Sequence, residues 1–487
     1  MNCTRKLKMM KAWYLFLLIV MLTGLHFKSY HVNPVPQRPN ILFCVADDWS
    51  GDHASIYGDK TVITPTFDRM AKEGVLFKRA FCASPSCSPS RAAILTGQYP
   101  HRLEEGGNLW GSLSMRYPNY AQLLEAQGYL VGMSRKGWGP GNDTIGGYKH
   151  NPAGQRYSNF EEFYAKKSPN QPFCYWFGST DPHRPYERGT GEKSGLKIET
   201  VQVPACFPDV PEIRQDILDY YFEVQRFDKE ISEIISFLEQ KGDLDNTIVV
   251  ITSDNGMPFP RAKANLYDLG TKMPLVISWK SRIKGGRLVN EMVNLIDLAP
   301  TFLEAASVKV PQEMSGKSLL SLLEGKRKEN LEKVQFLERE RHAYVRPNNL
   351  GYPSRGVRTN QFLYIANFQP DRYPAGNPEF VYVVGEYGDC DNSPTKSYMI
   401  ENKNKPEVAK LYALAFEKRP EEELYDLEKD PAQLYNVAEN PAYSKELDKL
   451  RKMLRKWQKQ THDPRYINPH DTRWDNFPYY GGGGKVD

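Results

Sequence analysis

The chain contains 487 residues, of which 40% are hydrophobic and 12% aromatic, so it can bury a large core and form more than one domain. Its 64 basic residues exceed its 59 acidic residues by only five, and no polybasic stripe is present, which argues against nucleic acid as a partner. The seven cysteines are too few and too irregularly spaced for a disulfide framework or a CxxC-type zinc site, although a single disulfide remains open.

The N-terminus, residues 1–26, has the pattern of a signal peptide. Basic residues between positions 5 and 11 precede an apolar run over 12–25 that is short for a membrane-spanning helix. Because no clean small-residue cleavage site follows, an uncleaved signal anchor is the alternative. Residues 27–38 contain prolines, lack an apolar period and predict a linker. We therefore expect an exported protein, either periplasmic or secreted.

Two continuous apolar runs predict strands that are buried on both faces of a parallel sheet. The first covers 40–46 and ends in Asp47 and Asp48, and the second covers 247–252 and ends in Asp254 and Asn255. Ligands of open α/β sheets collect at the carboxyl ends of the strands. We therefore expect the two acidic clusters to converge in space, although about two hundred residues separate them.

Helical and extended patterns alternate between these two runs. Apolar spacing predicts helices over 66–73, 120–127 and 212–241, and strands over 129–133 and 172–178. This alternation indicates an α/β sandwich. After a helix at 296–306 the pattern changes to strands over 336–345, 356–366 and 379–384, followed by an amphipathic helix over 444–461.

The change of pattern predicts the domain organisation. We expect a large N-terminal domain over 39–325 and a smaller α+β subdomain with an antiparallel sheet over 326–475, with the boundary in the charged stretch 324–329. Residues 476–487, which include four consecutive glycines, predict a flexible tail.

One motif dominates the functional interpretation. Residues 87–97 read C-S-P-S-R-A-A-I-L-T-G, and this run resembles the signature C-x-P-S-R-x-x-x-L-T-G of the type I sulfatases. Pro89 suits an early helical position, and a helix that opens at Ser90 and Arg91 offers free N–H groups to an anion such as sulfate. The alternative interpretation is a turn with a buried cysteine before an ordinary helix.

The resemblance implies a fold, a nucleophile and partners. The fold would be the alkaline phosphatase-like sandwich, with a large mixed, mostly parallel sheet between helices. In the family Cys87 would be oxidised to formylglycine by a formylglycine-generating or an anaerobic sulfatase-maturating enzyme. The hydrated aldehyde would then attack sulfur in a sulfated oligosaccharide, which is covalent catalysis.

The same resemblance implies one bound metal ion. Asp47, Asp48, Asp254 and Asn255 offer only oxygen ligands, which suit Ca²⁺ or Mg²⁺ and disfavour zinc. The family pattern assigns these four residues and the modified Cys87 to a single Ca²⁺, with Mg²⁺ as the second choice. The alternative for two aspartates after a strand is a helix cap or a turn.

Further catalytic roles are implied at positions that match the family motifs. Arg91 would brace the nucleophile and the metal ligands, Lys136 and Lys263 would bind sulfate, and His183 would assist the leaving group. The chain departs from the family at Trp138, where a histidine usually helps to release sulfate. His101 is a candidate substitute, although a lone surface histidine is the alternative interpretation.

The local sequence is most similar to that of the heparan N-sulfatases and their bacterial relatives. The similar segments are 252–260, 352–355, 456–458 and 461–464. They imply an exo-acting enzyme with a pocket for a terminal sulfated sugar, either N-sulfated glucosamine or an O-sulfated algal polysaccharide. The substrate-binding candidates are Arg184, Arg339 and His342, for which salt bridging within the protein is the alternative role. The resemblance also favours bacterial export.

Two rival classes remain. A phosphohydrolase of the alkaline phosphatase superfamily would share the sheet and its acidic strand ends, but it normally needs a Ser or Thr nucleophile and several histidines around two metal ions. A glycan-binding protein with the same fold would result if Cys87 stays a thiol in the native host. The oligomeric state is left open by the sequence.

Overall fold

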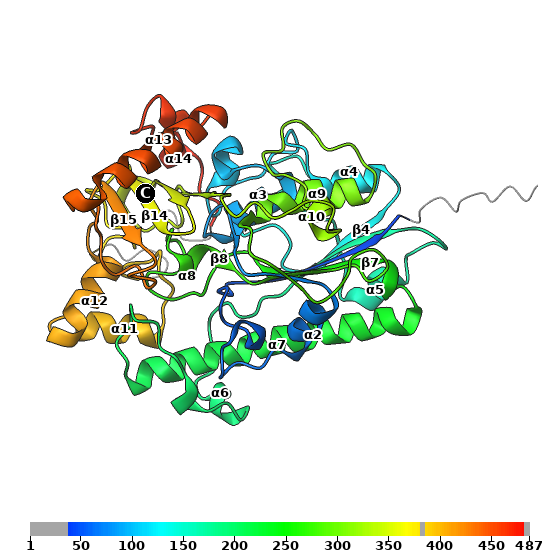
Figure 1. The fold of residues 1–487 in the computed structure, drawn as a ribbon, viewed down its shortest axis with the longest axis horizontal. Coiled ribbons are helices and arrows are strands. Elements are labelled where there is room, and N and C mark those ends of the chain that lie inside the picture. Colours follow the sequence, from blue (N-terminus) through cyan, green and yellow to red (C-terminus); the bar gives the residue numbers. More distant parts are fainter. Residues whose placement is uncertain (1–37, 380–384, 482–487) are drawn as a thin grey trace, which may run out of the picture. The chain divides into compact units, whose positions relative to one another are not determined.

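The computed structural model describes residues 38–379 and 385–481, and its centre is an eight-stranded sheet (Figure 1). The strand order is β10-β2-β9-β7-β1-β6-β4-β5. Strands β1, β4, β5, β6 and β7 run parallel, whereas β9 is antiparallel to both β2 and β7. The bounds are β1 Asn40–Ala46, β2 Val75–Phe77, β4 Leu130–Arg135, β5 Gln155–Arg156, β6 Phe173–Gly178, β7 Thr247–Ser253, β9 Leu275–Ser278 and β10 Arg287–Val289.

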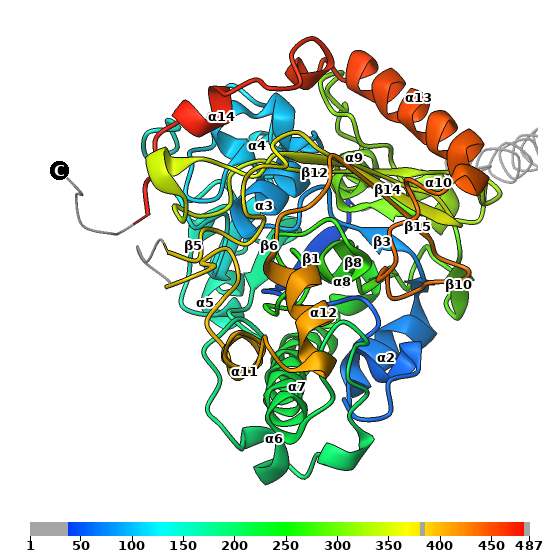
Figure 2. The same cartoon turned by 90° about the vertical axis from the view of Figure 1, so that its left-hand side faces the viewer.

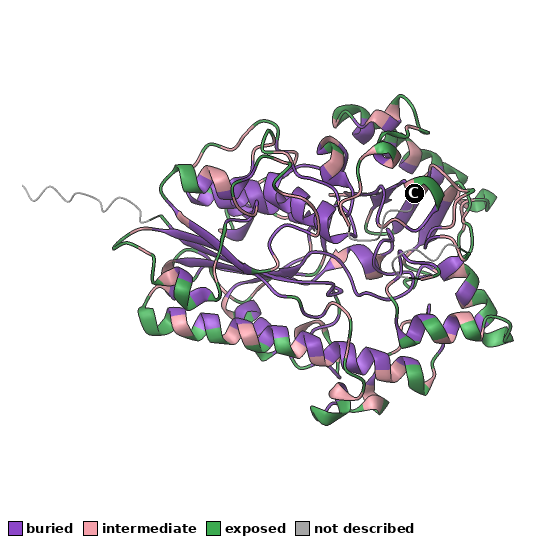
Figure 3. Cartoon of the chain, turned by 180° about the vertical axis from the view of Figure 1, so that it is seen from behind, coloured by how far each residue is buried: buried purple, intermediate pink, exposed green. Residues whose placement is uncertain are grey.

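The sheet is covered by helices on both faces because its central strands are apolar throughout. Alternate side chains of β1 enter two different cores: Leu42 and Cys44 face one, and Ile41 and Phe43 face the other. The first core is closed by α2 (Pro65–Glu73), α5 (Phe160–Tyr164) and α7 (Pro211–Lys241). The second is closed by α3 (Cys87–Thr96), α4 (Tyr120–Ala126), α9 (Leu298–Ala305) and α10 (Leu320–Leu323). Figure 3 shows the buried sheet between these two helical layers.

A second, antiparallel sheet follows in the C-terminal third. It consists of β12 (Gln335–Arg339), β13 (Ser354–Arg358), β14 (Phe362–Asn367) and β15 (Glu422–Asp426). The amphipathic α13 (Ser444–Gln460) lies over it, as Figure 2 shows, and packs Leu450, Leu454 and Trp457 against the sheet. The other strands and α-helices of the described residues are β3 (Ala80–Phe81), β8 (Lys272–Met273), β11 (Val293–Asn294), α6 (Thr190–Lys193), α8 (Asp268–Thr271), α11 (Pro394–Glu401), α12 (Pro406–Phe416) and α14 (Arg473–Asn476).

This architecture confirms the predicted fold class: a mixed, mostly parallel sheet between helices and a smaller antiparallel sheet. Two predicted strands are wrong in extent. The run 356–366 is a hairpin, β13 and β14, that turns at 359–361, and the strand predicted over 336–345 ends at Arg339. The strand predicted over 379–384 lies almost entirely outside the described residues. Helices α11 and α12 and strand β15 were not predicted from the sequence.

Several other expectations concern the ends of the chain and its cysteines. The signal peptide and almost all of the linker lie outside the described residues, and the boundary near 325 stays a prediction. The backbone carbonyls of Phe477 and Pro478 accept hydrogen bonds from Arg341, and the tail expected over 476–487 stays a prediction. The six cysteines of the described part are all free. Within the described ranges, 38–379 and 385–481, no helix has the length and apolar character needed to span a bilayer.

Candidate active site

The two acidic clusters meet at one edge of the main sheet. Strands β1 and β7 are parallel neighbours and pair Ala46 with Ser253, so the residues that follow both strands emerge side by side. The backbone N–H of Asp48 donates to Asp254 Oδ1 at 3.2 Å, and Asn255 Nδ2 donates to Asp48 Oδ1 at 2.7 Å. The structure therefore brings together Asp47, Asp48, Asp254 and Asn255, all of which are buried.

Cys87 lies at the first residue of α3 and faces this cluster. Its Sγ is 3.5 Å from Asp47 Oδ1 and 3.8 Å from Asp48 Oδ1. Burial raises the pKa of the Cys87 thiol well above its ordinary value, and the nearby Lys136 and Lys263 oppose this shift without reversing it. The side chain is therefore a protonated thiol at neutral pH and a poor nucleophile in its unmodified form.

Three cations surround the acidic cluster. Arg91 is fully buried, and its Nε donates to Asp254 Oδ2 at 2.7 Å. Lys136 Nζ donates to Asp47 Oδ1 at 2.7 Å, and Lys263 Nζ donates to Asp48 Oδ2 at 2.7 Å. Burial alone would raise the pKa of Asp47, but Lys136, His183 and Arg91 hold it well below its ordinary value. The site thus combines the ionised Asp47 carboxylate with cations that an anionic substrate can engage.

His183 stands at the open side of the cluster. Its Nδ1 lies 2.6 Å from the backbone carbonyl oxygen of Arg184, an acceptor, so Nδ1 carries the proton. Its Nε2 lies 3.8 Å from Asp48 Oδ2 and is the nitrogen that faces the site. About a third of the side chain is exposed, and the residue lines the same cavity as Cys87. This is the geometry of a residue that exchanges a proton with a bound ligand.

A cavity of about 660 Å³ gives access to these groups. Its lining includes Cys87, Lys136, His183, Lys263 and Trp138, which occupies the place of the family histidine. Residues from the C-terminal third also contribute to the lining: His342, Ala343, Tyr344, Val345, Gly388, Asp391 and Tyr479. Segments of the N-terminal and C-terminal parts of the chain therefore build one cavity, whose size suits a monosaccharide or disaccharide unit.

The acidic cluster fits a hard divalent cation. One oxygen from each of Asp47, Asp48 and Asp254, together with Cys87 Sγ, lies within 4.8 Å of all the others. The Oδ1 atom of Asn255 is buried and has no hydrogen-bond partner among the described residues, so it is available as a further ligand. Four oxygen donors of this kind match the preference of Ca²⁺ and Mg²⁺. The sequence-derived ligand set is consistent with this geometry.

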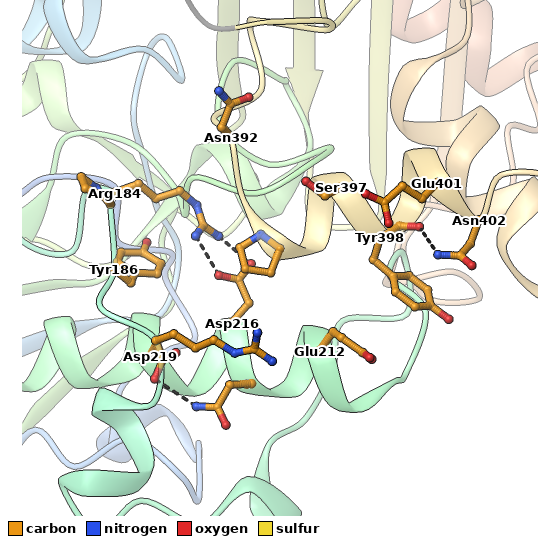
Figure 4. Close-up of a pocket in the computed structure, with 14 residues that line it drawn as sticks. Arg184, Tyr186, Glu212, Asp216, Asp219, Asn392, Ser397, Tyr398, Glu401 and Asn402 are labelled. Carbon is orange, nitrogen blue, oxygen red and sulfur yellow. Dashed lines mark hydrogen bonds and ion pairs between the residues drawn. The ribbon is translucent and has the colours of Figure 1, made fainter.

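Two of the three predicted substrate-binding residues lie elsewhere. The prediction for Arg339 is wrong, because its Nη2 donates to Asp389 Oδ2 at 2.6 Å and its side chain is 3% exposed and absent from the cavity lining. Arg184 forms a bidentate ion pair with Asp216, in which Nη1 donates to Oδ1 at 2.7 Å and Nη2 donates to Oδ2 at 2.8 Å. It lines a second cavity, next to α11 (Figure 4). Both arginines perform the alternative role of bracing the protein.

His342, the third candidate, does line the cavity. Its Nδ1 lies 2.8 Å from the hydroxyl of Ser86, the residue before Cys87. Burial lowers the pKa of His342 to about 4, a shift that Asp389 opposes and Lys263 reinforces. The ring is therefore neutral at physiological pH and can offer a hydrogen bond but no charge to a ligand.

The suggestion that His101 supplies a base to the site is wrong, and so is the alternative of a surface position. His101 is buried, its Nδ1 lies 2.6 Å from Glu338 Oε2, and its Nε2 lies 3.2 Å from the carbonyl oxygen of Thr461. Both neighbours are acceptors, so both nitrogens donate and the ring is an imidazolium. Burial alone would lower the pKa of His101, but the carboxylates of Glu338 and Asp463 raise it despite Arg355.

This buried ion pair makes stability depend on pH. Because the folded-state pKa of His101 is raised, the pair stabilises fully below the unfolded-state pKa of about 6.5 and loses its effect as pH rises through the folded-state value. We expect His101→Gln to lower the free energy of unfolding by about 3 kcal/mol at pH 6 and by only about 1 kcal/mol at pH 9. Urea unfolding at both pH values measures this difference. An equal loss at both would contradict a charged His101.

Asp391, which is not among the residues predicted from the sequence, lines the cavity beside Lys263 and His183. It belongs to the loop 388–392, which precedes α11 and contains two aspartates and a glycine. An acidic loop before a helix is an available signal, but such loops are also common as plain helix caps. Only the tertiary fold shows that this loop reaches the ends of β1 and β7.

The fold and the site together define a hydrolase of the alkaline phosphatase-like type. The sulfatase family model matches residues 39–308, which is more than half of the chain, and this chain belongs to the sulfatase family. A second model, for the C-terminal region of N-sulphoglucosamine sulphohydrolase, matches residues 261–373. The chain is therefore an enzyme that hydrolyses sulfate esters or sulfamates.

Individual relatives cover most of the chain. An ulvan-active sulfatase of Formosa agariphila is 29% identical over 88% of this chain and 82% of its own length. Human N-sulphoglucosamine sulphohydrolase is 28% identical over 88% of this chain and 91% of its own. Among solved structures, a protein bound to its substrate D-glucosamine-2-N,6-O-disulfate has a TM-score of 0.63 at 21% identity, covering 88% and 99% of the two chains. A phosphonate monoester hydrolase of Silicibacter pomeroyi has a TM-score of 0.64 at 17% identity, covering 88% and 97%. These two structures show the shared fold alone.

Proposed function

We propose that this sulfatase is exo-acting and removes sulfate from a terminal N-sulfated glucosamine of a glycan. The observation that carries the proposal is a single cavity in which Cys87, Lys136, Lys263 and His183 surround the space beside the acidic cluster. The match of the C-terminal model and the 28% identity to the human N-sulphoglucosamine sulphohydrolase support the choice of sugar.

In this proposal each residue of the site has a separate role in binding or cleaving the substrate. Lys136 and Lys263 hold the sulfate oxygens. His183 in its imidazolium form donates a proton from Nε2 to the leaving group, and Arg91 fixes Asp254 and the loop of Lys136. Oxidation of Cys87 to formylglycine supplies the nucleophile that the protonated thiol lacks. Asp47, Asp48, Asp254 and Asn255 would hold a Ca²⁺ ion, with Mg²⁺ as the second choice, which would supply positive charge for the sulfate oxygens.

Sulfate release from defined substrates tests this proposal. The protein, produced with a maturating enzyme, is incubated with N-sulfoglucosamine, glucosamine 6-O-sulfate and an O-sulfated ulvan oligosaccharide. We expect the highest kcat/KM for N-sulfoglucosamine. The ulvan-active relatives make an O-sulfatase of polysaccharides the second candidate function, and a preference for the ulvan oligosaccharide would establish that candidate instead.

The same assays separate the rival classes. A phosphohydrolase would release phosphate from aryl phosphates or phosphonates, with Zn²⁺ stimulating the reaction. A glycan-binding protein without activity would bind sulfated oligosaccharides and release nothing. Sulfate release without phosphate release distinguishes the proposed sulfatase from both.

Metal removal has an expected effect on activity and on stability. Chelation is expected to lower sulfate release at least about tenfold, because the sulfate oxygens lose their cation. Added Ca²⁺ is expected to restore activity and to raise Tm with the logarithm of the free Ca²⁺ concentration above Kd, since binding only to the folded state stabilises that state. Calorimetry with and without Ca²⁺ measures the second effect independently of turnover. Full activity and an unchanged Tm after chelation would contradict a metal site at the acidic cluster.

We also propose that the enzyme is exported to the periplasm or secreted, in keeping with the apolar run over 12–25. Fractionation of expressing cells tests this, and an intact mass of the recovered protein shows whether residues 1–26 are removed. Recovery of the full-length chain from the membrane fraction would support the signal anchor instead.

A further inference from the structure

Asp391 is a carboxylate in the substrate cavity that none of the roles above uses. It lies in the loop before α11 and lines the cavity together with Cys87, His183 and Lys263. About a quarter of its side chain is exposed, whereas Asp47, Asp48 and Asp254 are almost completely buried. Asp391 therefore faces the space that the substrate fills, and it comes from the part of the chain that follows the main sheet.

The Asp391 carboxylate forms an ion pair but lacks a hydrogen bond at Oδ2. That atom is buried, lies 3.2 Å from Lys263 Nζ and accepts no hydrogen bond from any described residue. Burial alone would raise the pKa of Asp391, but Lys263, His183 and His342 lower it to about 2, so the group is ionised at neutral pH. A carboxylate that is ionised and has few hydrogen bonds is stabilised by a ligand that supplies a donor.

The loop that carries Asp391 is held rigidly. Asp389 Oδ2 accepts hydrogen bonds from Arg339 at 2.6 Å and from Arg346 at 2.7 Å. Lys396 Nζ donates to the backbone carbonyl oxygen of Cys390 at 2.9 Å. These contacts lie directly beside Asp391 in the chain, so its carboxylate is placed before any ligand arrives. Arg339, which does not touch the cavity, thereby gains a positioning role.

Asp391 also lies on the leaving-group side of the site. One atom each of Asp391, Asp48 and His183 lies within 4.8 Å of the others. Since His183 Nε2 is the proposed proton donor to the leaving group, the atom that departs from sulfur sits next to the Asp391 carboxylate. The chemistry of that atom then decides whether the carboxylate attracts or repels it.

We propose that Asp391 is a specificity-determining residue that accepts a hydrogen bond from the N–H of a sulfamate and so favours N-sulfated over O-sulfated substrates. A sulfamate nitrogen carries an N–H donor, whereas the bridging oxygen of a sulfate ester carries only lone pairs, which a carboxylate repels. When the S–N bond breaks, sulfur passes to the nucleophile at position 87. The electron pair stays on nitrogen, and His183 donates one proton to it. The released amine then takes up a proton from water to become an ammonium, which Asp391 pairs with by charge. This inference rests on the proposed sulfatase function.

The test compares kcat/KM of wild type and Asp391→Asn on N-sulfoglucosamine and on the sulfate ester 4-nitrophenyl sulfate. Asparagine keeps the shape but removes the charge and one acceptor. We expect kcat/KM for N-sulfoglucosamine to fall roughly 10- to 100-fold, the worth of a charge-assisted hydrogen bond, while that for the ester falls much less or rises. Asp371→Asn, an exposed aspartate of the same region, is the matched control and is expected to change neither value.

The outcomes are distinguishable. An equal loss on both substrates would show that Asp391 only positions Lys263, since the sulfate half is common to both, and would overturn the proposal. A loss confined to the ester would overturn it as well. A variant that fails to fold is detected by its Tm, in which case Asp391→Glu, which keeps the charge and is expected to retain the preference for N-sulfoglucosamine, decides in its place. Wild-type protein that cleaves neither substrate would instead contradict the proposed function itself.

Discussion

Replacing Cys87 with alanine is expected to abolish sulfate release, lowering kcat/KM by at least about 10⁴-fold. Cys87 is the one cysteine of the described residues that lies within 4 Å of both Asp47 and Asp48 and lines the cavity. No neighbouring side chain can take over a nucleophile that forms from this residue. Ion chromatography of released sulfate, with protein produced alongside a maturating enzyme, measures the loss.

The matched control for this variant is Cys206→Ala. Cys206 is also a buried, free cysteine, but it lines a different cavity beside Pro204 and Arg261. Its activity is expected to stay within about threefold of wild type, since ordinary core substitutions act on stability and leave the chemistry intact. Substantial sulfate release by Cys87→Ala would show that another group is the nucleophile.

Arg91→Met is expected to cause the largest loss of stability, about 3–5 kcal/mol in the free energy of unfolding, together with loss of activity. The guanidinium is fully buried between Asp254 and the carbonyl oxygens of Lys136 and Gly137, at 2.7 to 2.9 Å. Methionine fills a similar volume but leaves the Asp254 carboxylate without its cation. Denaturant unfolding in the presence of chelator measures the effect without compensation by a metal ion.

An exposed arginine provides the comparison. Arg116 pairs with Glu104 at the surface, where the two side chains are 56% and 53% exposed. We expect Arg116→Met to cost no more than about 1 kcal/mol, because exposed ion pairs are screened by water and salt. Similar losses for the two variants would mean that burial does not make the Arg91 ion pair important.

The sequence predicted those parts of the site that follow directly from strands. Continuous apolar runs locate β1 and β7, and because parallel strands end at one edge, the polar residues after them must meet. A helix in the Cys87 motif is likewise a local prediction, although the structure begins it at Cys87, three residues before the expected opening at Ser90. These features needed no knowledge of long-range packing.

The site predictions that were wrong concern residues whose roles depend on tertiary contacts. The charged residues of segment 338–342 favoured a role in glycan recognition. Arg339 instead forms an ion pair with Asp389, fifty residues away in the sequence. His101 became a buried cation only because β12 places Glu338 next to it. Asp391 enters the cavity through a loop whose path is fixed by Arg339 and Arg346. A charged residue in the sequence does not disclose whether its partner is a ligand or another side chain.

The most direct test of the central claim is the mass of the peptide that contains Cys87, taken from protein that releases sulfate. Conversion of the cysteine to formylglycine replaces CH₂–SH by CHO, so we expect the converted peptide to be about 18 Da lighter than the unmodified peptide. The fraction of converted peptide is expected to rise in proportion to the specific activity. An unmodified cysteine in fully active protein would contradict the proposed mechanism.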